Sequence, residues 1–208
     1  MTSSDSSTPD SATLQPIHIV IDVLNDFISG PMECLHAKEA ISKIVERINV
    51  HPNEEVIYVC DAHPANHCSF VEYGGIWPPH CIKYSFGQQI NLAFYTCVNL
   101  PVQRPRISEN IYEKGRNPSC EEYSGYNATG ANGKTLGESL LPNQPVVVSG
   151  IATEFCVLET VKDLLQAGHP VEVLVEGLAY VTLEGHREAL GEMREMGGRW
   201  EDRKIVRS

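Results

Sequence analysis

The sequence contains no long hydrophobic run, no excess of basic residues and no paired CxxC motif. A membrane-spanning helix needs about 20 consecutive apolar residues, and no stretch of the 208 residues approaches that length. Acidic residues outnumber basic ones by 27 to 16, so the formal net charge is −11. An acidic chain without a basic cluster is a poor match for nucleic acid or an anionic membrane surface. We therefore expect neither of them as a partner.

The seven cysteines are odd in number, unlike the paired set of an extracellular disulfide framework. The first 15 residues are rich in Ser, Thr and Pro, and they lack the apolar segment of a signal peptide. From these two features we expect a reduced, cytoplasmic protein with a disordered tail over residues 1–15. The remaining residues, 16–208, fit one folded domain with a substantial core.

Strand-like and helix-like patterns alternate along the chain from residue 17 onward. Strand patterns occur at residues 17–23, 55–61, 110–115, 146–150 and 171–177, with a final edge strand expected at 203–206. Helical spacing of apolar residues occurs at 37–48, weakly at 86–97, and at 134–141, 157–165 and 183–196. This alternation predicts a three-layer α/β/α fold with a mostly parallel sheet of about six strands. Ligands bind such sheets beyond the carboxyl ends of the strands.

Reactive side chains follow four of the expected strands: Asp22, then Asp61 with His63, then Lys114, and finally Cys156. Taken one at a time, Asp22 could cap a turn, Lys114 could be a solvated lysine and Cys156 could be a small core residue. Thr153 as a helix N-cap would place Cys156 in the first helical turn. There, free N–H groups and the helix dipole favour a thiolate and a lowered pKa. A neighbouring acid and lysine would complete a nucleophilic site.

The stretch CDAHPANHCSF and the later WPPHC supply four candidate metal ligands: Asp61, His63, His67 and His80. Asp61 and His63 are two positions apart, so at a strand end they project from the same face. One carboxylate with up to three imidazoles suits Zn²⁺ better than Fe or Mn. The alternative is a set of surface histidines in a polar loop, and we favour the metal. Cys68 and Cys81 each follow a candidate histidine, and we interpret them as bystanders.

Five motifs, in this order along the chain, resemble the nicotinamidase branch of the isochorismatase-like cysteine hydrolases: VIDVLNDF, CDAHPANHCSF, GIWPPHC, YEKG and VSGIATEFCV. The resemblance covers residues 16–206 and implies an isochorismatase-like, Rossmann-like fold. It also implies an amidohydrolase that converts nicotinamide to nicotinate and ammonia in NAD salvage, a part of pyridine nucleotide biosynthesis.

The resemblance assigns roles to individual residues. The implied catalytic residues are Asp22, Lys114 and Cys156, and the implied oxyanion hole is formed by the backbone amides of Ala152 and Cys156, after a cis Ile151–Ala152 bond. The implied substrate-ring pocket contains Phe27, Trp77 and Tyr123, and the implied metal ligands are Asp61, His63, His67 and His80. In the implied reaction the cysteine forms a thioester, and the metal anchors the pyridine nitrogen.

Three positions depart from the residues that similar members often have: Leu24 in place of Gln, Ala62 in place of an aromatic residue, and Glu154 in place of Asp. These departures bear on the shape of the pocket and so on substrate preference. A related cysteine hydrolase acting on another small amide therefore stays open. So do a metallohydrolase that uses metal-bound hydroxide and a non-catalytic metal-binding protein. The sequence leaves open the metal's identity, the use of pyrazinamide-like analogues and assembly into a homo-oligomer.

Overall fold

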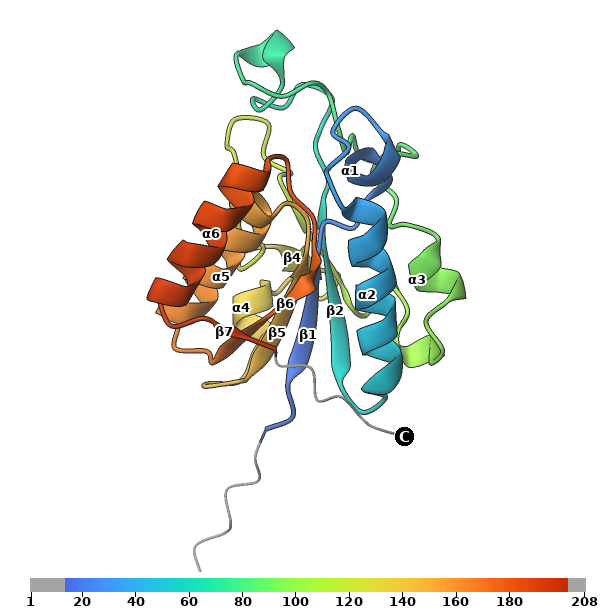
Figure 1. Cartoon of the computed structure of the whole chain (residues 1–208). Helices are drawn as coiled ribbons and strands as arrows, with labels where there is room; N and C mark the ends of the chain where they lie inside the picture. Colours follow the sequence, from blue (N-terminus) through green and yellow to red (C-terminus); the bar gives the residue numbers. More distant parts are fainter. Residues whose placement is uncertain (1–13, 202–208) are drawn as a thin grey trace, which may run out of the picture.

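Alternating strands and helices build a seven-stranded sheet between two helical layers in the computed structural model, which describes residues 14–201 (Figure 1). All but two residues of the expected tail, and the expected edge strand over 203–206, lie outside the described residues. The three-layer architecture and the mostly parallel sheet predicted from the sequence are confirmed. Within residues 14–201, no helix is both long and apolar enough to cross a membrane.

The sheet has the strand order β4-β3-β2-β1-β5-β6-β7. Its parallel strands are β1 (Ile17–Ile21), β2 (Glu55–Asp61), β3 (Ile111–Lys114), β5 (Val146–Gly150), β6 (Val171–Leu178) and β7 (Arg199–Trp200). At one edge, the short β4 (Thr129–Gly130) runs antiparallel to β3. Sequence patterns indicated five of these strands and missed β4 and β7, which are two residues long each and too short to show a hydrophobic period. The chain steps outward from β1 in both directions, so the strand order reverses between β1 and β5.

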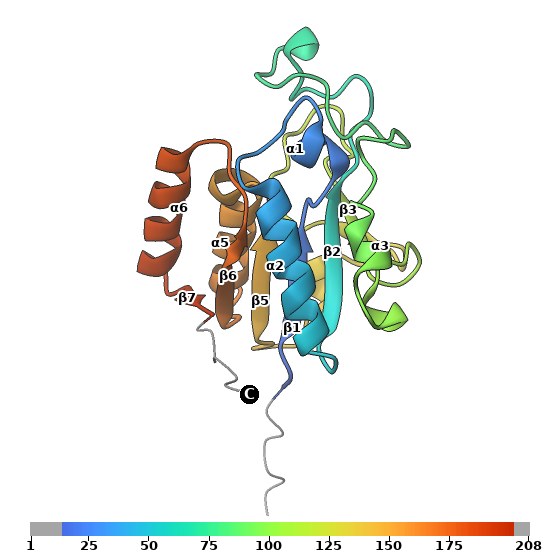
Figure 2. The same ribbon diagram turned by 45° about the vertical axis from the view of Figure 1, so that its right-hand side comes forward.

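Helices cover both faces of the sheet (Figure 1, Figure 2). One layer contains α1 (Asn25–Ser29), α2 (Ala37–Val50) and α3 (Ala93–Thr96), and the other contains α4 (Leu136–Ser139), α5 (Leu158–Gln166) and α6 (Leu183–Glu195). Successive strand residues point to opposite faces, so Val20 joins the core under α2 while Ile19 and Ile21 join the core under α5. The central strands are thus buried on both sides, as their unbroken apolar patterns indicate.

The expected helix over 86–97 is wrong for most of its length, because only Ala93–Thr96 is helical. The residues before it pair with the chain that follows β1. Asn91 N, for example, donates to the Val23 carbonyl at 2.9 Å. Backbone groups used in this pairing are not available for helical hydrogen bonds. The segment instead supports the turn from β1 into α1.

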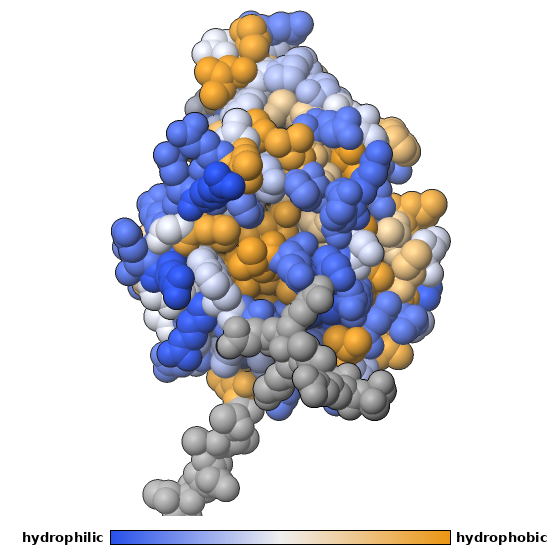
Figure 3. Space-filling model, viewed as in Figure 1, coloured by the Kyte–Doolittle hydropathy of each residue, from blue (hydrophilic) through white to orange (hydrophobic). Residues whose placement is uncertain are grey.

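The long loop between β2 and β3 projects beyond the carboxyl ends of the strands and carries the short helix η1 (Val71–Tyr73) at its tip (Figure 1). The hydrophobic residues Val71, Tyr73 and Ile76 are exposed at this tip, where hydrophobic side chains reach the surface (Figure 3). The loop is closed at its base, where Trp77 N donates to the Ser69 carbonyl at 3.0 Å. This closure fixes Trp77 above the edge of the sheet where the strands end.

Candidate active site

Four neighbouring strands end at one edge of the sheet and bring four reactive side chains together. Asp22 follows β1, Asp61 ends β2, Lys114 ends β3, and Cys156 follows β5 after a short connection. These strands are direct neighbours in the order β3-β2-β1-β5. All four side chains are buried. The adjacency of the strands therefore explains why residues distant in the sequence form one group.

Lys114 connects the members of this group. Its Nζ lies 2.9 Å from Asp22 Oδ2 and 2.5 Å from Asp61 Oδ1. It also donates to the sulfur of Cys156 at 3.4 Å. Burial alone would lower the pKa of Lys114, but the two carboxylates outweigh burial and raise this pKa well above its usual value. Lys114 therefore carries a positive charge at neutral pH and compensates the buried acids.

The glycine that follows Lys114 meets two structural requirements. Gly115 has a φ of +65°, a conformation that glycine adopts without strain. A Cβ at this position would lie 2.4 Å from Cε1 of His63. The Gly115 amide donates to Glu122 Oε2 at 2.7 Å, which holds the turn in place. The YEKG motif therefore positions both the lysine and the neighbouring histidine.

The two buried aspartates differ in their protonation. Burial and the charge of Asp61 raise the pKa of Asp22 to about 6, although Lys114 opposes the rise. Burial would also raise the pKa of Asp61, but Lys114 and His63 outweigh it and hold this pKa below its usual range. Asp61 therefore stays ionised. Asp22 has the pKa expected of a group that exchanges a proton near neutral pH.

The expectation of a lowered pKa for Cys156 is wrong. Burial is the largest influence and raises the pKa of the thiol well above its usual value, and the two aspartates raise it further. Lys114 lowers this pKa without reversing the shift. The effect of the helix start is outweighed because the thiol is desolvated beside two carboxyl groups. Cys156 therefore rests as a thiol, with Asp22 as a hydrogen-bonding neighbour.

The expected N-cap is also wrong. Thr153 does not cap a helix, since its hydroxyl donates to the Ala179 carbonyl at 3.0 Å. Cys156 lies in a single π-helical turn, η3 (Thr153–Val157), which precedes α5. The bond between Ile151 and Ala152 is cis, as the resemblance implies.

Three of the four expected metal ligands form one buried group: Asp61, His63 and His80. Their candidate ligand atoms all lie within 4.8 Å of one another. His63 Nδ1 donates to the Gly115 carbonyl at 3.0 Å, and His80 Nδ1 donates to the Pro78 carbonyl at 2.8 Å. Because a carbonyl only accepts, each ring has a proton on Nδ1. This leaves Nε2 of each ring to face the group, and His63 Nε2 lies 3.5 Å from Asp61 Oδ2. One carboxylate and two imidazoles oriented in this way fit a divalent metal with open positions.

His67 lies outside this metal-binding group. Its Nε2 donates to the Cys120 carbonyl at 3.1 Å, and its Nδ1 accepts from the Ser69 hydroxyl at 2.7 Å. Both ring nitrogens are therefore in use, and neither has a lone pair for a metal. The ring instead lies beside His63, with 4.2 Å between the ring centroids. His67 was expected as a ligand from its spacing in the sequence, and spacing does not reveal the hydrogen-bond partners of the ring nitrogens.

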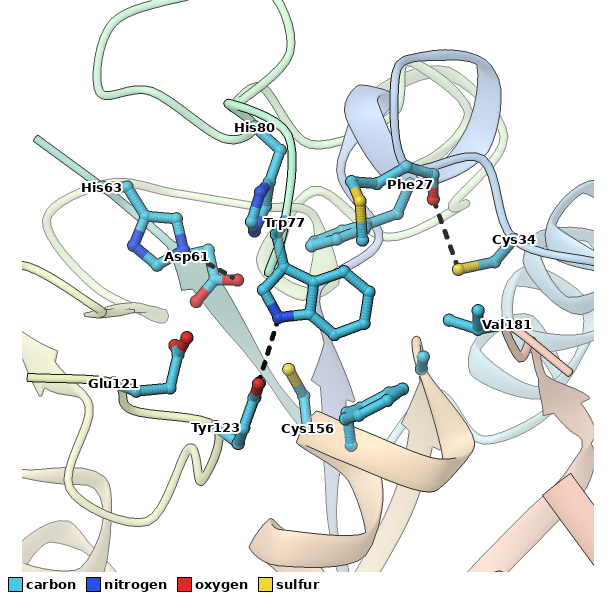
Figure 4. Close-up of a pocket in the computed structure, with 13 residues that line it drawn as sticks. Phe27, Cys34, Asp61, His63, Trp77, His80, Glu121, Tyr123, Cys156 and Val181 are labelled. Atoms are coloured by element: carbon cyan, nitrogen blue, oxygen red, sulfur yellow. Dashed lines mark hydrogen bonds and ion pairs between the residues drawn. The ribbon is translucent and has the colours of Figure 1, made fainter. Parts of the chain in front are cut away.

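A pocket opens between the metal-binding group and Cys156 (Figure 4). The three expected ring-pocket residues all line it: Phe27, Trp77 and Tyr123. Trp77 Nε1 donates to the Tyr123 hydroxyl at 3.1 Å, and the Trp77 ring meets Phe155 edge to face at 5.2 Å. Ala152 and Cys156 also line the pocket. Aromatic walls next to a thiol suit a flat ring that carries a reactive carbonyl group.

Sequence reasoning missed five further lining residues: Met32, Cys34, Glu121, Phe155 and Val181. Val181 could not be assigned because loop residues have no period that reveals the direction of a side chain, and Phe155 lies in η3, a single turn that is too short to show one. Neither Leu24 nor Ala62 lines the pocket, and both are buried in the core. Within residues 14–201, Cys68 and Cys81 lie outside the metal-binding group, in agreement with their interpretation as bystanders.

Comparisons with known proteins give one family. The isochorismatase domain model matches residues 131–204. The nicotinamidase of Escherichia coli (strain K12) is 28% identical over 187 residues, which cover 80% of this chain and 84% of that protein. The nicotinamidase/pyrazinamidase of Mycobacterium tuberculosis (strain ATCC 25618 / H37Rv) is 30% identical over 186 residues, which cover 85% of this chain and 92% of that protein.

A solved structure agrees with these sequence relatives. The crystal structure of the pyrazinamidase of Pyrococcus horikoshii in complex with zinc superposes with a TM-score of 0.76 at 30% sequence identity. The match covers 89% of this chain and 97% of that chain. The similarity therefore extends over nearly the whole described fold and is not confined to one motif.

Proposed function

Because this chain belongs to the isochorismatase-like hydrolases, in their nicotinamidase branch, we propose that it hydrolyses nicotinamide to nicotinate and ammonia. The observation that carries the proposal is the buried contact of Lys114 with Asp22, Asp61 and the Cys156 sulfur. Beside this contact, an aromatic pocket leads from the thiol to a metal-binding group. The arrangement offers a nucleophile for a carboxamide and an anchor for a ring nitrogen.

Asp22 acts as the general base in the first half of the reaction. It takes the proton of the Cys156 thiol while the sulfur attacks the carboxamide carbon. Its pKa of about 6 leaves much of it ionised at neutral pH. Proton transfer coupled to attack suits a thiol that is not ionised at rest. Lys114 holds the acid and the sulfur close together and balances the charge that moves between them.

The second half of the reaction returns the enzyme to its starting state. Backbone amides at Ala152 and Cys156 stabilise the oxyanion of the tetrahedral intermediate. Asp22 then gives its proton to the departing nitrogen, and ammonia leaves behind a thioester. Water adds to the thioester with Asp22 again as base. The carbon–sulfur bond breaks, Cys156 regains its proton, and nicotinate is released.

Asp61, His63 and His80 would hold one divalent metal, and we propose zinc, with Fe or Mn as alternatives. When bound, such a metal supplies a Lewis acid for the lone pair of the pyridine nitrogen. The zinc complex of the Pyrococcus horikoshii relative supports this choice. We propose three protein ligands in place of the four expected from the sequence, because both ring nitrogens of His67 have other partners. Conversion of nicotinamide to nicotinate would serve NAD salvage, and we propose the cytoplasm as its location.

The test of the function is ammonia release from nicotinamide, with pyrazinamide and an unrelated small amide as comparison substrates. Wild-type protein should release ammonia fastest from nicotinamide or pyrazinamide. Cys156→Ala should keep its metal and still bind nicotinate, yet release no ammonia. Ammonia release by Cys156→Ala at a substantial rate would favour the metallohydrolase alternative, in which metal-bound hydroxide attacks. No turnover of nicotinamide by the wild type would refute the proposed function.

A further inference from the structure

The end of the pocket away from the metal-binding group has an apolar wall made of Cys34 and Val181. Figure 4 places both side chains on one side of Cys156 and Trp77, with Asp61 and His63 on the other. Burial raises the pKa of Cys34 to about 12, so its thiol stays neutral and behaves as a small apolar group. The residues implied for the substrate pocket by sequence resemblance do not include this Cys34–Val181 wall.

The wall is assembled from two segments that are distant in the sequence. Leu35 N donates to the Tyr180 carbonyl at 2.8 Å, and Tyr180 N donates to the Leu35 carbonyl at 3.2 Å. Leu35 and Tyr180 thus form an antiparallel bridge. Cys34 precedes Leu35 and Val181 follows Tyr180, so Cys34 and Val181 lie next to each other. The position of the wall therefore depends on what holds the turn after Tyr180.

Glu154 holds that turn. Its Oε1 accepts from the Val181 amide at 2.9 Å and from the Thr182 amide at 2.7 Å. Both amides lie at the start of α6, where backbone N–H groups lack helical partners and favour a negatively charged acceptor. Glu154 belongs to the same turn as Cys156. Its carboxylate therefore links the turn that carries the nucleophile to the opposite wall of the pocket.

We propose that the Cys34–Val181 wall decides which ring substituents the site accepts, and that Glu154 is a positioning residue for this wall. The inference rests on the proposed function. With the amide carbon at Cys156 and the ring nitrogen toward the metal-binding group, the opposite ring edge consists of C4 and C5. This edge faces the wall. C6 is bonded to the ring nitrogen and lies at the metal end.

The size of the pocket makes the wall selective. The free cavity is about 30 Å³, far below the roughly 300 Å³ of a typical small-molecule site. A methyl group at C5 adds volume directly against Val181. One extra methyl group in an apolar pocket changes discrimination by about 10- to 200-fold.

The first experiment compares kcat/KM for nicotinamide, 5-methylnicotinamide and 6-methylnicotinamide in wild type and Val181→Ala. We expect Val181→Ala to raise the 5-methyl to nicotinamide ratio by about tenfold and to leave the 6-methyl ratio unchanged. Val175→Ala is the matched control, since it removes the same atoms from a partly buried valine in the core under α5. An equal 5-methyl ratio in Val181→Ala and Val175→Ala overturns the inference. An inactive wild type would instead refute the proposed function itself.

The second experiment tests Glu154 through three substitutions. Glu154→Ala leaves the Val181 and Thr182 amides without their acceptor, so it should raise KM for nicotinamide and shift the 5-methyl ratio in the same direction as Val181→Ala. Glu154→Gln keeps an acceptor oxygen at the same reach and should retain a ratio near that of wild type. Glu154→Asp is shorter by one methylene and should lie between them. A general loss of stability would lower activity on nicotinamide and on both methylnicotinamides alike, and so would leave the 5-methyl to nicotinamide ratio unchanged. An unchanged ratio in both Glu154→Ala and Glu154→Asp would therefore show that Glu154 does not position the wall.

Discussion

At the scale of single residues, the site depends on how buried charges are balanced. Lys114 carries one positive charge among two carboxyl groups and a thiol, all of them buried. Asp61 stays ionised, and its negative charge together with burial raises the pKa of Asp22 to about 6. A base in this state can accept a proton from Cys156 and return it without large reorganisation. Burial therefore raises the pKa of the nucleophile Cys156 and also the pKa of its base, Asp22.

Asp22→Asn should lower kcat on nicotinamide by at least about 100-fold, because the amide cannot accept the thiol proton. The substitution keeps the shape of the side chain, so the metal content and nicotinate affinity should stay near those of wild type. Steady-state ammonia release and nicotinate titration measure these quantities. A kcat within a few-fold of wild type would exclude Asp22 as the base.

His18 should make folding stability depend on pH below about 6.5. Burial lowers the pKa of His18 well below its usual value, with smaller contributions from Arg47 and His51. The unfolded chain therefore binds this proton at a higher pH than the folded chain does. The stability contributed by neutral His18 is complete above its unfolded pKa and is lost as pH falls, by up to about 1.4 kcal/mol per pH unit.

Urea unfolding of wild type and His18→Gln at pH 7.5 and pH 5.5 measures this contribution. His18 bonds to the Ser149 hydroxyl at 2.8 Å, and Gln can keep a hydrogen bond there without titrating. The loss of unfolding free energy between the two pH values should be smaller in His18→Gln. Equal losses in both proteins would assign the pH dependence to other groups.

At the scale of elements, two of the segments that carry reactive residues depart from regular geometry. Cys156 lies in the π-helical turn η3, and Asp22 has a φ of +49° immediately after β1. The segment before α3 is not helical, because its backbone groups pair with the chain that turns from β1 into α1. These departures direct Asp22 and Cys156 toward Lys114, which ends the regular strand β3. The regular helices, by contrast, should respond to substitution as ordinary helices do.

Two glycines of α6 provide a matched comparison. A Cβ at Gly191 would meet no atom within 4 Å, so Gly191→Ala should stabilise the protein by about 0.5–1 kcal/mol. A Cβ at Gly185 would lie 2.9 Å from Thr182 Oγ1 and 3.2 Å from Glu154 Oε1. Gly185→Ala should lose this gain because it crowds the N-terminal cap of the helix.

Thermal unfolding of the two variants measures the difference. Gly191→Ala should raise Tm by about 1–4 °C for a chain of this size, while Gly185→Ala should give no rise or a fall. Equal stabilisation by both substitutions would contradict the predicted crowding of a Cβ at position 185 by Thr182 and Glu154.

At the scale of the whole molecule, strand order creates the site. The outward steps of the chain from β1 place the ends of β3, β2, β1 and β5 side by side. The loop between β2 and β3 then returns His80 and Trp77 to the pocket at this edge (Figure 4). A metal held by Asp61, His63 and His80 would therefore connect β2 to this loop. Binding to the folded chain alone stabilises it by mass action.

Zinc should raise the unfolding free energy of the wild type, by about 2.7 kcal/mol when free zinc is 100 times its dissociation constant. His80→Ala removes a ligand and should lose most of this increase. His67→Ala is the matched control, because His67 has other partners for both ring nitrogens, so it should keep the increase. Chemical unfolding with and without zinc, together with metal titration, measures both effects. Loss of the zinc-dependent increase in His67→Ala would show that His67 is a fourth metal ligand.

The sequence by itself determined the order of the elements, the mostly parallel sheet and the strand ends that carry the reactive residues. Each of these features follows from short-range patterns: apolar periods, β-branched runs and motifs of a few residues. The grouping of Asp22, Lys114 and Cys156 also followed, because the carboxyl ends of parallel strands share one edge. The sequence likewise indicated Asp61, His63, His67 and His80 as candidate metal ligands from their residue types and spacing, and three of them form one buried group.

Only the tertiary structure decided the protonation of the thiol, the hydrogen-bond partners of His67 and the position of the Cys34–Val181 wall. The pKa of Cys156 depends on burial and on the charges of Asp22, Asp61 and Lys114. His67 is occupied by the distant Cys120 carbonyl as well as by its neighbour Ser69. The physical reason is common to all three: desolvation, electrostatic coupling and hydrogen-bond competition depend on distances in space, and local sequence patterns do not contain these distances.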